Sequence, residues 1–322
     1  MNYDSLSDKF LNALGKLRSV KPNLIHHIAD ILDMDETSVY RRLRGTVKFT
    51  IDEMGLLAQR FHLSLDALMG DMPEGAYQSW KMDLPLIVDE NGFDLDLIEQ
   101  SLPLLRRYVE EPDTERGGVI GFLSRHFFME YREIAKFMLF KWGHYYSDIP
   151  SFSQYDTVEI PERLFQLYRD HVAEYKKIKH TFYIWDNRII SKLVDDIQYF
   201  RSMLLLSEAD TLLLKKEIFL LLDDFERIAE SGQIAETGNS FELYISPIHI
   251  DTSHVYLHFG NFWHYSLEVY GVRSFVTFKP HVCEDLCKRI NKLKAASVLI
   301  SNSAEKERIL FFKKQRDIVD SL

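Results

Sequence analysis

The chain has 322 residues, of which 46% are hydrophobic and 27% charged, and its formal net charge is −10. This length suggests two or three domains, and the composition is ordinary for a globular protein. The net acidity argues against a protein that coats nucleic acid indiscriminately. The two cysteines, Cys283 and Cys287, are too few for a structural zinc site or a disulfide framework.

The sequence contains no recognisable segment that would direct it to a membrane. The first ten residues, MNYDSLSDKF, lack the basic and apolar regions of a secretory signal. No run of about 20 apolar residues occurs, so no transmembrane helix is predicted. We therefore expect a cytoplasmic protein without a membrane partner.

The N-terminal region contains one short segment that is rich in basic residues. Residues 1–70 hold nine of the 39 basic and nine of the 49 acidic residues, which leaves 30 basic and 40 acidic residues in the remainder. The N-terminal region is therefore neutral, and the acidity lies outside it. Within this neutral region, Arg41, Arg42, Arg44 and Lys48 fall within eight residues.

Caps and apolar spacing predict five short helices within residues 1–70. Asp35 is placed to cap the third helix, and Gly45 follows that helix where a left-handed residue commonly ends one. Thr50 and Glu53 have the spacing of a capping box at the start of the fourth helix. The predicted ranges are 5–18, 24–32, 36–44, 50–61 and 65–69.

The second and third of these helices have the pattern of a helix-turn-helix. Ala29 is small enough to let the two helices cross closely, and Met34 supplies an apolar residue in the turn. Val39 and Leu43 supply the inner face of the second helix of the motif. The outer face then carries polar and basic side chains that can bond to base edges or phosphates from the major groove.

These side chains are the candidate DNA-binding residues, and Arg42 is placed to touch phosphate at the flank. The alternative is that this segment is merely a solvated helix face, but a short helix after a short turn and an alanine-bearing helix favours DNA binding. The candidates are Thr37, Ser38, Tyr40, Arg41, Arg42, Arg44 and Lys48.

Residues 23–69 resemble the Cro/C1-type helix-turn-helix domains of bacterial repressors, also called XRE or lambda repressor-like. The run from Ser38 to Gly45, with residues 49–53 and 61–66, is similar to BetR-like regulators found mainly in Bacteroidetes. Residues 133–142 and 297–312 also resemble parts of those proteins, more loosely. Asp33 stands where the turn often carries Gly, and Asp tolerates the left-handed conformation better than most residues. The resemblance implies a DNA-binding regulator, and it implies no function for the C-terminal region.

The remainder of the chain is predicted to contain a linker at 71–94, a helical dimerisation or sensor region at 95–235, and a small α+β domain with an antiparallel sheet at 236–322. The fold class expected for the whole chain is therefore mainly α. Predicted helices in the middle region span 95–110, 120–146, 161–179, 190–206 and 208–231. From Phe241 a period of two predicts strands, then helices flanking one more strand. These strands and helices span 241–245, 255–259, 263–269, 273–278, 282–293, 297–300 and 304–322.

Two clusters suggest chemistry without a matching motif. Residues His249, Asp251, His254, His258 and His264 crowd on the predicted strands, but hydrogen-bonded or solvent-facing histidines are more common there than a metal site. The glycine-rich run 117–121 fits neither phosphate-loop motif and is interpreted as a loop before a helix. We expect no metal, no cofactor and no enzymatic activity.

The sequence thus predicts a sequence-specific DNA-binding transcription regulator, with residues 36–44 as the recognition helix in the major groove. Double-stranded DNA is the expected partner, and a homodimer is expected because one such motif contacts only a few base pairs. The C-terminal region is expected to dimerise, to sense a small-molecule or peptide effector, or both. The alternative is a protein–protein adaptor on a helix-turn-helix scaffold, which the neutral charge of the N-terminal region keeps open.

Overall fold

The computed structural model describes residues 6–18, 23–61, 63, 65, 81–83, 95–146, 150–269 and 273–322. The chain divides into two compact units, Met1–Gln78 and Ser79–Leu322, here called the N-terminal unit and the C-terminal unit. Most of the predicted helix at 65–69 and of the predicted linker at 71–94 lies outside the described residues.

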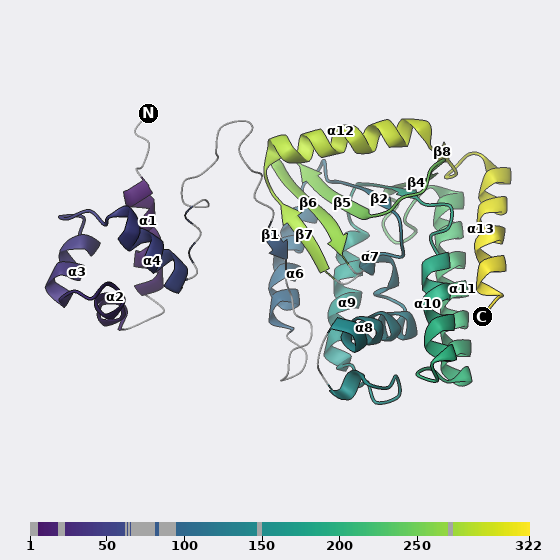
Figure 1. Ribbon diagram of the computed structural model, residues 1–322. Coiled ribbons are helices and arrows are strands. Elements are labelled where there is room, and N and C mark those ends of the chain that lie inside the picture. The colour runs from purple at the N-terminus through teal and green to yellow at the C-terminus, as the bar shows by residue number, and fades with distance from the viewer. Residues whose placement is uncertain are drawn as a thin grey trace. The chain divides into compact units, whose positions relative to one another are not determined.

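The described part of the N-terminal unit is helical, as predicted (Figure 1). Its helices are α1 (Leu6–Arg18), α2 (Leu24–Leu32), α3 (Glu36–Leu43) and α4 (Ile51–Phe61). They enclose a core in which Phe10, Ile28, Val39 and Leu57 are fully buried. The capping box at the start of α4 is present, since the backbone N–H of Glu53 donates to the Thr50 hydroxyl at 3.1 Å and that of Thr50 to the Glu53 carboxylate at 2.8 Å.

One mixed sheet of eight strands organises the described part of the C-terminal unit, in the order β1-β7-β6-β5-β2-β3-β4-β8. The pairs β2–β3 and β3–β4 are parallel, and the other neighbouring strands are antiparallel. The strands are β1 (Lys81–Asp83), β2 (Glu115–Ile120), β3 (His180–Trp185), β4 (Ser240–Ile245), β5 (Ser253–Phe259), β6 (Phe262–Val269), β7 (Arg273–Thr277) and β8 (Val298–Leu299).

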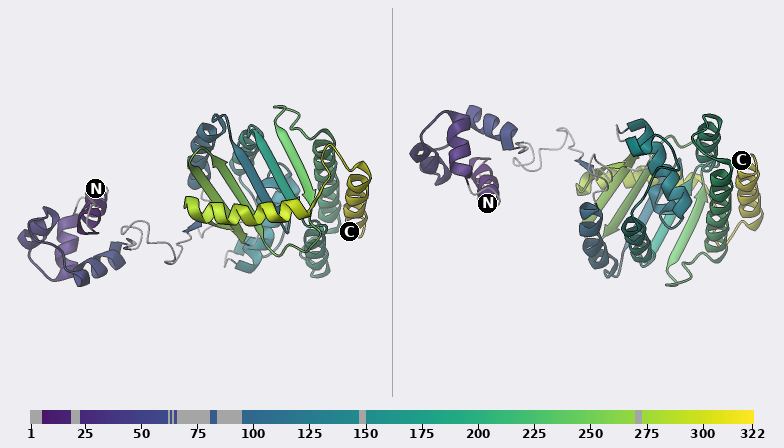
Figure 2. Two further views of the ribbon diagram at one scale, coloured as in Figure 1. Left: turned by 90° about the horizontal axis from the view of Figure 1, so that it is seen from above. Right: turned by 90° about the horizontal axis from the view of Figure 1, so that it is seen from below.

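Helices cover both faces of this sheet. The helix α12 (Pro280–Ala296) crosses one face, and α7 (Arg125–Phe128), α8 (Arg132–Tyr146) and α9 (Glu162–Tyr175) lie on the other (Figure 2). The remaining helical elements are α6 (Asp96–Val109), η1 (Pro150–Phe152), α10 (Ser191–Ser202), α11 (Glu208–Ser231) and α13 (Glu305–Val319). No helix in the described ranges is long and apolar enough to cross a membrane.

The predicted fold class is wrong for the C-terminal unit. Instead of a helical region followed by a small antiparallel sheet, β2 and β3 from within residues 95–235 lie at the centre of a larger mixed sheet. Periodicity could not reveal them, because parallel strands buried on both faces do not alternate between apolar and polar residues. Accordingly, the predicted helix at 120–146 is replaced by the end of β2, then α7 and α8.

Residues 117–120 of the glycine-rich run belong to β2 rather than to a loop, and Gly121 follows the strand. A Cβ atom at Gly117 would lie 2.5 Å from ring atoms of both Phe182 and Tyr256 on the two neighbouring strands. A Cβ at Gly118 would lie 2.9 Å from the backbone oxygen of His254. The two glycines therefore allow large aromatic side chains to meet across the central strand, which is a known use of glycine within strands.

We expect Gly117→Ala to lower the free energy of unfolding of the C-terminal unit by about 1–3 kcal/mol, because overpacking forces buried side chains off their rotamers. Urea denaturation of the full chain would measure the change. The control must be a glycine that can accept a Cβ atom without strain. Gly238 does not qualify, because its φ is +69°. Gly55 does, because a Cβ there would contact nothing within 4 Å. Gly55→Ala in α4 should therefore leave the C-terminal unit unchanged, and an equally stable Gly117→Ala variant would contradict the packing described here.

Trp185 joins parts of the C-terminal unit that are distant in sequence. It lies at the end of β3, is fully buried, and packs its ring against Phe127, Phe225 and Phe311. These three phenylalanines come from α7, α11 and α13. The middle and C-terminal regions therefore share one hydrophobic core.

Candidate nucleic-acid interface

The turn between α2 and α3 depends on one residue in the left-handed conformation. Asp33 has φ of 48° and ψ of 53°, and the next N–H, that of Met34, donates to the Ala29 carbonyl at 3.1 Å. Ala29 is 7% exposed and Val39 is fully buried, so α2 and α3 pack closely through a small residue and a branched one. This arrangement is the one that the helix-turn-helix pattern predicts.

Asp35 fixes the start of α3. Its carboxylate accepts the backbone N–H of Ser38 at 2.9 Å and the Ser38 hydroxyl at 2.7 Å. These hydrogen bonds lower the pKa of Asp35 from its usual value, so the cap is charged at neutral pH. The Ser38 hydroxyl thus already serves the cap, and it is available to DNA only through its remaining lone pairs.

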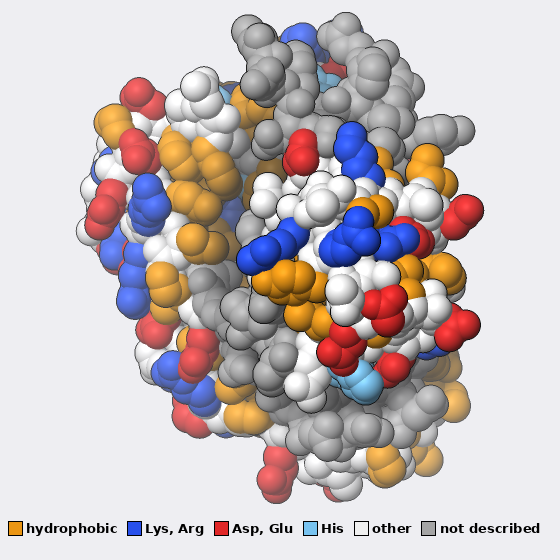
Figure 3. Space-filling model, turned by 90° about the vertical axis from the view of Figure 1, so that its left-hand side faces the viewer, with side chains coloured by type: hydrophobic (Ala, Val, Ile, Leu, Met, Phe, Trp, Pro, Cys, Tyr) orange, Lys and Arg blue, Asp and Glu red, His pale blue; other side chains and the backbone are white. Residues whose placement is uncertain are grey.

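The exposed face of α3 carries the candidate residues Thr37, Tyr40 and Arg41, and the exposed C-cap residue Arg44 follows at the end of the helix. The guanidinium of Arg44 lies over the Tyr40 ring, 4.7 Å from its centroid, which orders both side chains on the surface. In Figure 3, which looks from the side on which α3 lies in Figure 1, Lys and Arg side chains gather near the middle of the view. Asp and Glu side chains lie below and beside them.

Lys48 extends this basic surface beyond the end of α3. The carbonyl of Arg41 accepts the N–H groups of Thr46 and Val47 at 3.0 and 3.3 Å, which folds the following loop back onto the helix end. Lys48 is exposed, and the neighbouring Phe49 anchors the loop because it is 5% exposed. Within residues 6–18 and 23–61, Arg41, Arg44 and Lys48 form no ion pair, so their charges face solvent.

Arg42 differs from the other basic residues of α3, because a carboxylate holds it. Its guanidinium donates to both oxygens of Glu53 in α4, from Nη2 at 2.8 Å and from Nε at 3.1 Å. The two side chains are 19% and 16% exposed. Burial acts to raise the pKa of Glu53, but hydrogen bonds from Arg42 and Thr50 outweigh it, so the pKa lies below its usual value. This pair ties α3 to α4.

Arg42→Ala should therefore lower the free energy of unfolding of the N-terminal unit by about 1–2 kcal/mol, the scale of a charged hydrogen bond lost from a partly buried partner. Because the pKa of Glu53 is lowered in the folded state, this stabilisation is present at neutral pH and disappears as the pH falls through that pKa. Thermal unfolding at neutral and acidic pH would measure both effects. A difference between variant and parent that persists undiminished in acid would contradict the role given to Glu53.

The histidines that suggested a metal site are engaged in other contacts. His254 lies 2.7 Å from the Thr252 hydroxyl and 3.1 Å from that of Tyr265, and the ring of His258 lies 3.9 Å from that of Trp263. His249 contacts Asp186 at 3.0 Å. The described residues contain no group of three or more His, Cys, Asp or Glu side chains that could hold a metal ion.

The N-terminal helices match one known family. The family model of the BetR domain covers residues 8–85. This segment is a BetR domain. It is a helix-turn-helix domain of the XRE type, as the resemblance of residues 23–69 implied. The BetR domain accounts for about a quarter of the chain and contains every candidate DNA-binding residue. No curated protein and no solved structure matches the chain.

Sequence reasoning missed the partner of Arg42 within the BetR domain. Glu53 was recognised as part of a capping box, and the structure shows that its Oε2 atom accepts from both Thr50 and Arg42. Nothing in the spacing of Arg42 and Glu53 indicates this contact, because the loop between α3 and α4 decides which residues meet. The structure therefore gives Arg42 a part in holding the helices together, in addition to the phosphate contact predicted from sequence.

Proposed function

We propose that this protein is a sequence-specific regulator of transcription that acts in the cytoplasm and binds double-stranded DNA with α3 in the major groove. The observation that carries this proposal is the exposed face of α3. That face presents Arg41 and Arg44, with Lys48 beyond the helix end, without ion-pair partners in the described BetR domain. Exposed basic side chains on the second helix of such a motif are the groups that reach base edges and phosphates.

The positions of the side chains indicate which of them contact base edges and which contact phosphates. Thr37 and Arg41 lie on the exposed face of α3 where they can reach base edges, and Tyr40 lies beside them. Arg44 and Lys48, at the end of the helix and beyond it, are placed for phosphate contacts. Since Glu53 already binds Arg42, we expect Arg42 to contribute less to DNA affinity than Arg41 or Arg44.

We further propose that the protein binds DNA as a homodimer through the C-terminal unit. A single helix-turn-helix reads only a few base pairs, so specificity normally requires two half-sites about one helical turn apart. The helix α11 offers an apolar surface for such a contact, since Leu212, Leu213 and Leu220 are each about half exposed. Light scattering of the full chain, free and bound to DNA, tests this part separately.

The decisive experiment is selection of bound sequences from a random double-stranded DNA library, using the full-length protein. We expect an enriched motif with two half-sites, and an affinity that falls steeply as salt rises because phosphate contacts release counterions. Enrichment of no motif, together with binding that does not depend on salt, would overturn the proposal and favour the protein–protein adaptor.

A further inference from the structure

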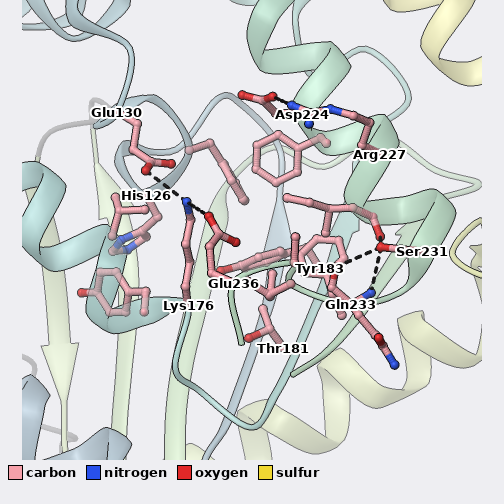
Figure 4. Close-up of a pocket in the computed structure, with 18 of the residues that line it drawn as sticks. His126, Glu130, Lys176, Thr181, Tyr183, Asp224, Arg227, Ser231, Gln233 and Glu236 are labelled. Atoms are coloured by element: carbon pink, nitrogen blue, oxygen red, sulfur yellow. Dashed lines mark hydrogen bonds and ion pairs between the residues drawn. The ribbon is translucent and has the colours of Figure 1, made fainter. Parts of the chain in front are cut away.

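The C-terminal unit contains a cavity of 430 Å³ that plays no part in the proposed DNA interface. Side chains of the parallel strands form its floor, and α7, α9 and α11 supply its walls (Figure 4). The lining combines aromatic and aliphatic side chains with a few charged ones. This volume and this mixture are typical of sites for small molecules.

A buried cation lies in the floor of this cavity. Arg116 of β2 is 4% exposed, and its guanidinium lies 3.9 Å from the centroid of the Tyr175 ring, with Tyr183 at 6.0 Å. Within residues 95–146, 150–269 and 273–322, its guanidinium has no ion-pair or hydrogen-bond partner. A charge that is buried without a partner costs free energy, so its presence requires an explanation other than stability.

The other charged groups lining the cavity are paired at its rim. The Lys176 ammonium lies between two carboxylates, 3.2 Å from Glu130 and 2.9 Å from Glu236 (Figure 4). Asp224 pairs with Arg227 and accepts the hydroxyl of Tyr131. Because these groups satisfy one another, Arg116 is the charged residue of this lining that has no ion-pair partner in the part of the chain that the structure describes.

The buried carboxyl group of Glu268 is close enough to Arg116 to interact with its charge, but the two side chains form no ion pair. Glu268 of β6 is 5% exposed and accepts the Ser124 hydroxyl at 2.6 Å. Burial raises the pKa of Glu268, whereas the hydrogen bond from Ser124 and the charges of Arg125 and Arg116 act to lower it. Burial, together with the charges of Arg116 and Arg125, holds the pKa of His126 well below its usual value. The Nδ1 atom of that histidine is buried without a partner among the described residues.

We propose that this cavity binds a small organic carboxylate with an apolar body, whose carboxylate accepts hydrogen bonds from Arg116 and from the hydroxyl of Thr181. Thr181 is the register neighbour of Arg116 on β3, is 7% exposed and also lines the cavity. A guanidinium matches the planar carboxylate in a two-bonded arrangement, and stacking on Tyr175 orients it beforehand.

The charges at the rim favour a carboxylate over a phosphate. Glu130, Asp224 and Glu236 surround the opening with only Lys176 and Arg227 to balance them, so a dianion would meet more repulsion than a monoanion. The apolar body of the ligand would lie against Val172, Phe225 and Ile228. This inference goes beyond the proposed function, and neither depends on the other.

The test is isothermal titration of the full-length protein with phenylacetate, and with 2-phenylethanol as a neutral molecule of similar size. We expect saturable binding of phenylacetate at one site, and binding of the alcohol at least about tenfold weaker, the scale of one charged hydrogen bond. Indole-3-acetate and decanoate extend the series to larger apolar bodies. Failure of all three carboxylates to bind saturably, or equal binding of the alcohol, would overturn the proposal.

Two variants test whether phenylacetate binds at the floor of the cavity. Arg116→Met should abolish phenylacetate binding while the melting temperature of the ligand-free protein stays equal or rises, since an unpaired buried charge has been removed. Arg132→Met, which removes an exposed partner of Glu162 outside the cavity, should leave binding unchanged. If Arg116→Met does not fold, Thr181→Val decides: several-fold weaker binding supports the proposal, and unchanged binding overturns it.

Discussion

Replacing Arg41 and Arg44 together with alanine is expected to lower the affinity of this protein for its selected DNA sequence by at least about 30-fold. A good contact from arginine to a base edge contributes about 1–3 kcal/mol, and a phosphate contact adds a salt-dependent share. Arg41 on α3 and Arg44 at the C-cap of that helix are both exposed, and neither has an ion-pair partner within residues 6–18 and 23–61. Their removal should therefore weaken binding without unfolding the BetR domain.

The two single variants, Arg41→Ala and Arg44→Ala, are distinguished by how their DNA affinity depends on salt. Loss of a phosphate contact lowers the slope of log affinity against log salt by about 1, whereas loss of a base contact relaxes specificity at one position of the site. Arg60→Ala is the matched control for each single variant, Arg41→Ala and Arg44→Ala, because Arg60 is exposed in the last turn of α4 and its loss also removes one positive charge. A folded double variant that binds as tightly as the parent would show that α3 is not the recognition helix.

Trp185→Ala is expected to destabilise the C-terminal unit by about 3–5 kcal/mol, the usual cost of removing a large buried aromatic side chain. Trp185 is fully buried between β3 and helices from both halves of this unit. Because the unit has one sheet, all of it should unfold in one transition that shifts to lower urea concentration. Circular dichroism and tryptophan fluorescence during urea unfolding of the full chain would measure this shift.

Two further variants sharpen this result. Trp185→Phe should cost less than Trp185→Ala, since it keeps an aromatic ring and removes an indole N–H that has no partner among the described residues. Leu310→Ala, at a position 55% exposed on α13 and outside the proposed dimer surface, should change stability little. Two separate transitions, one for residues 95–235 and another for 236–322, would contradict the single core.

Local signals in the sequence were sufficient for most of the helices. The N-terminal helices follow from caps such as Asp35 and from the Thr50–Glu53 capping box, and α11 has the predicted bounds 208–231. These signals work because a cap is formed by atoms within four residues of one another. The strands from Phe241 onward were also found, because their apolar and polar residues alternate.

The central strands could not be found in this way. The side chains that require Gly117 to lack a Cβ atom come from Phe182 and Tyr256, so the reason for that glycine lies in two other strands. The sequence 180–185 has no alternation, because both faces of β3 are covered. From the sequence alone, a helical region was therefore predicted where the structure has the middle of a sheet.

The sequence by itself determined the presence of a helix-turn-helix, the BetR domain that contains it, and the basic character of residues 41–48. Each of these rests on residues that are close together in the chain. Only the tertiary structure decided that Arg42 pairs with Glu53, that Arg116 lines a cavity without an ion-pair partner among the described residues, and that β1 to β8 form one sheet. The physical reason is the same in each case. Burial and pairing depend on which distant side chains arrive at the same place, and no local pattern records that.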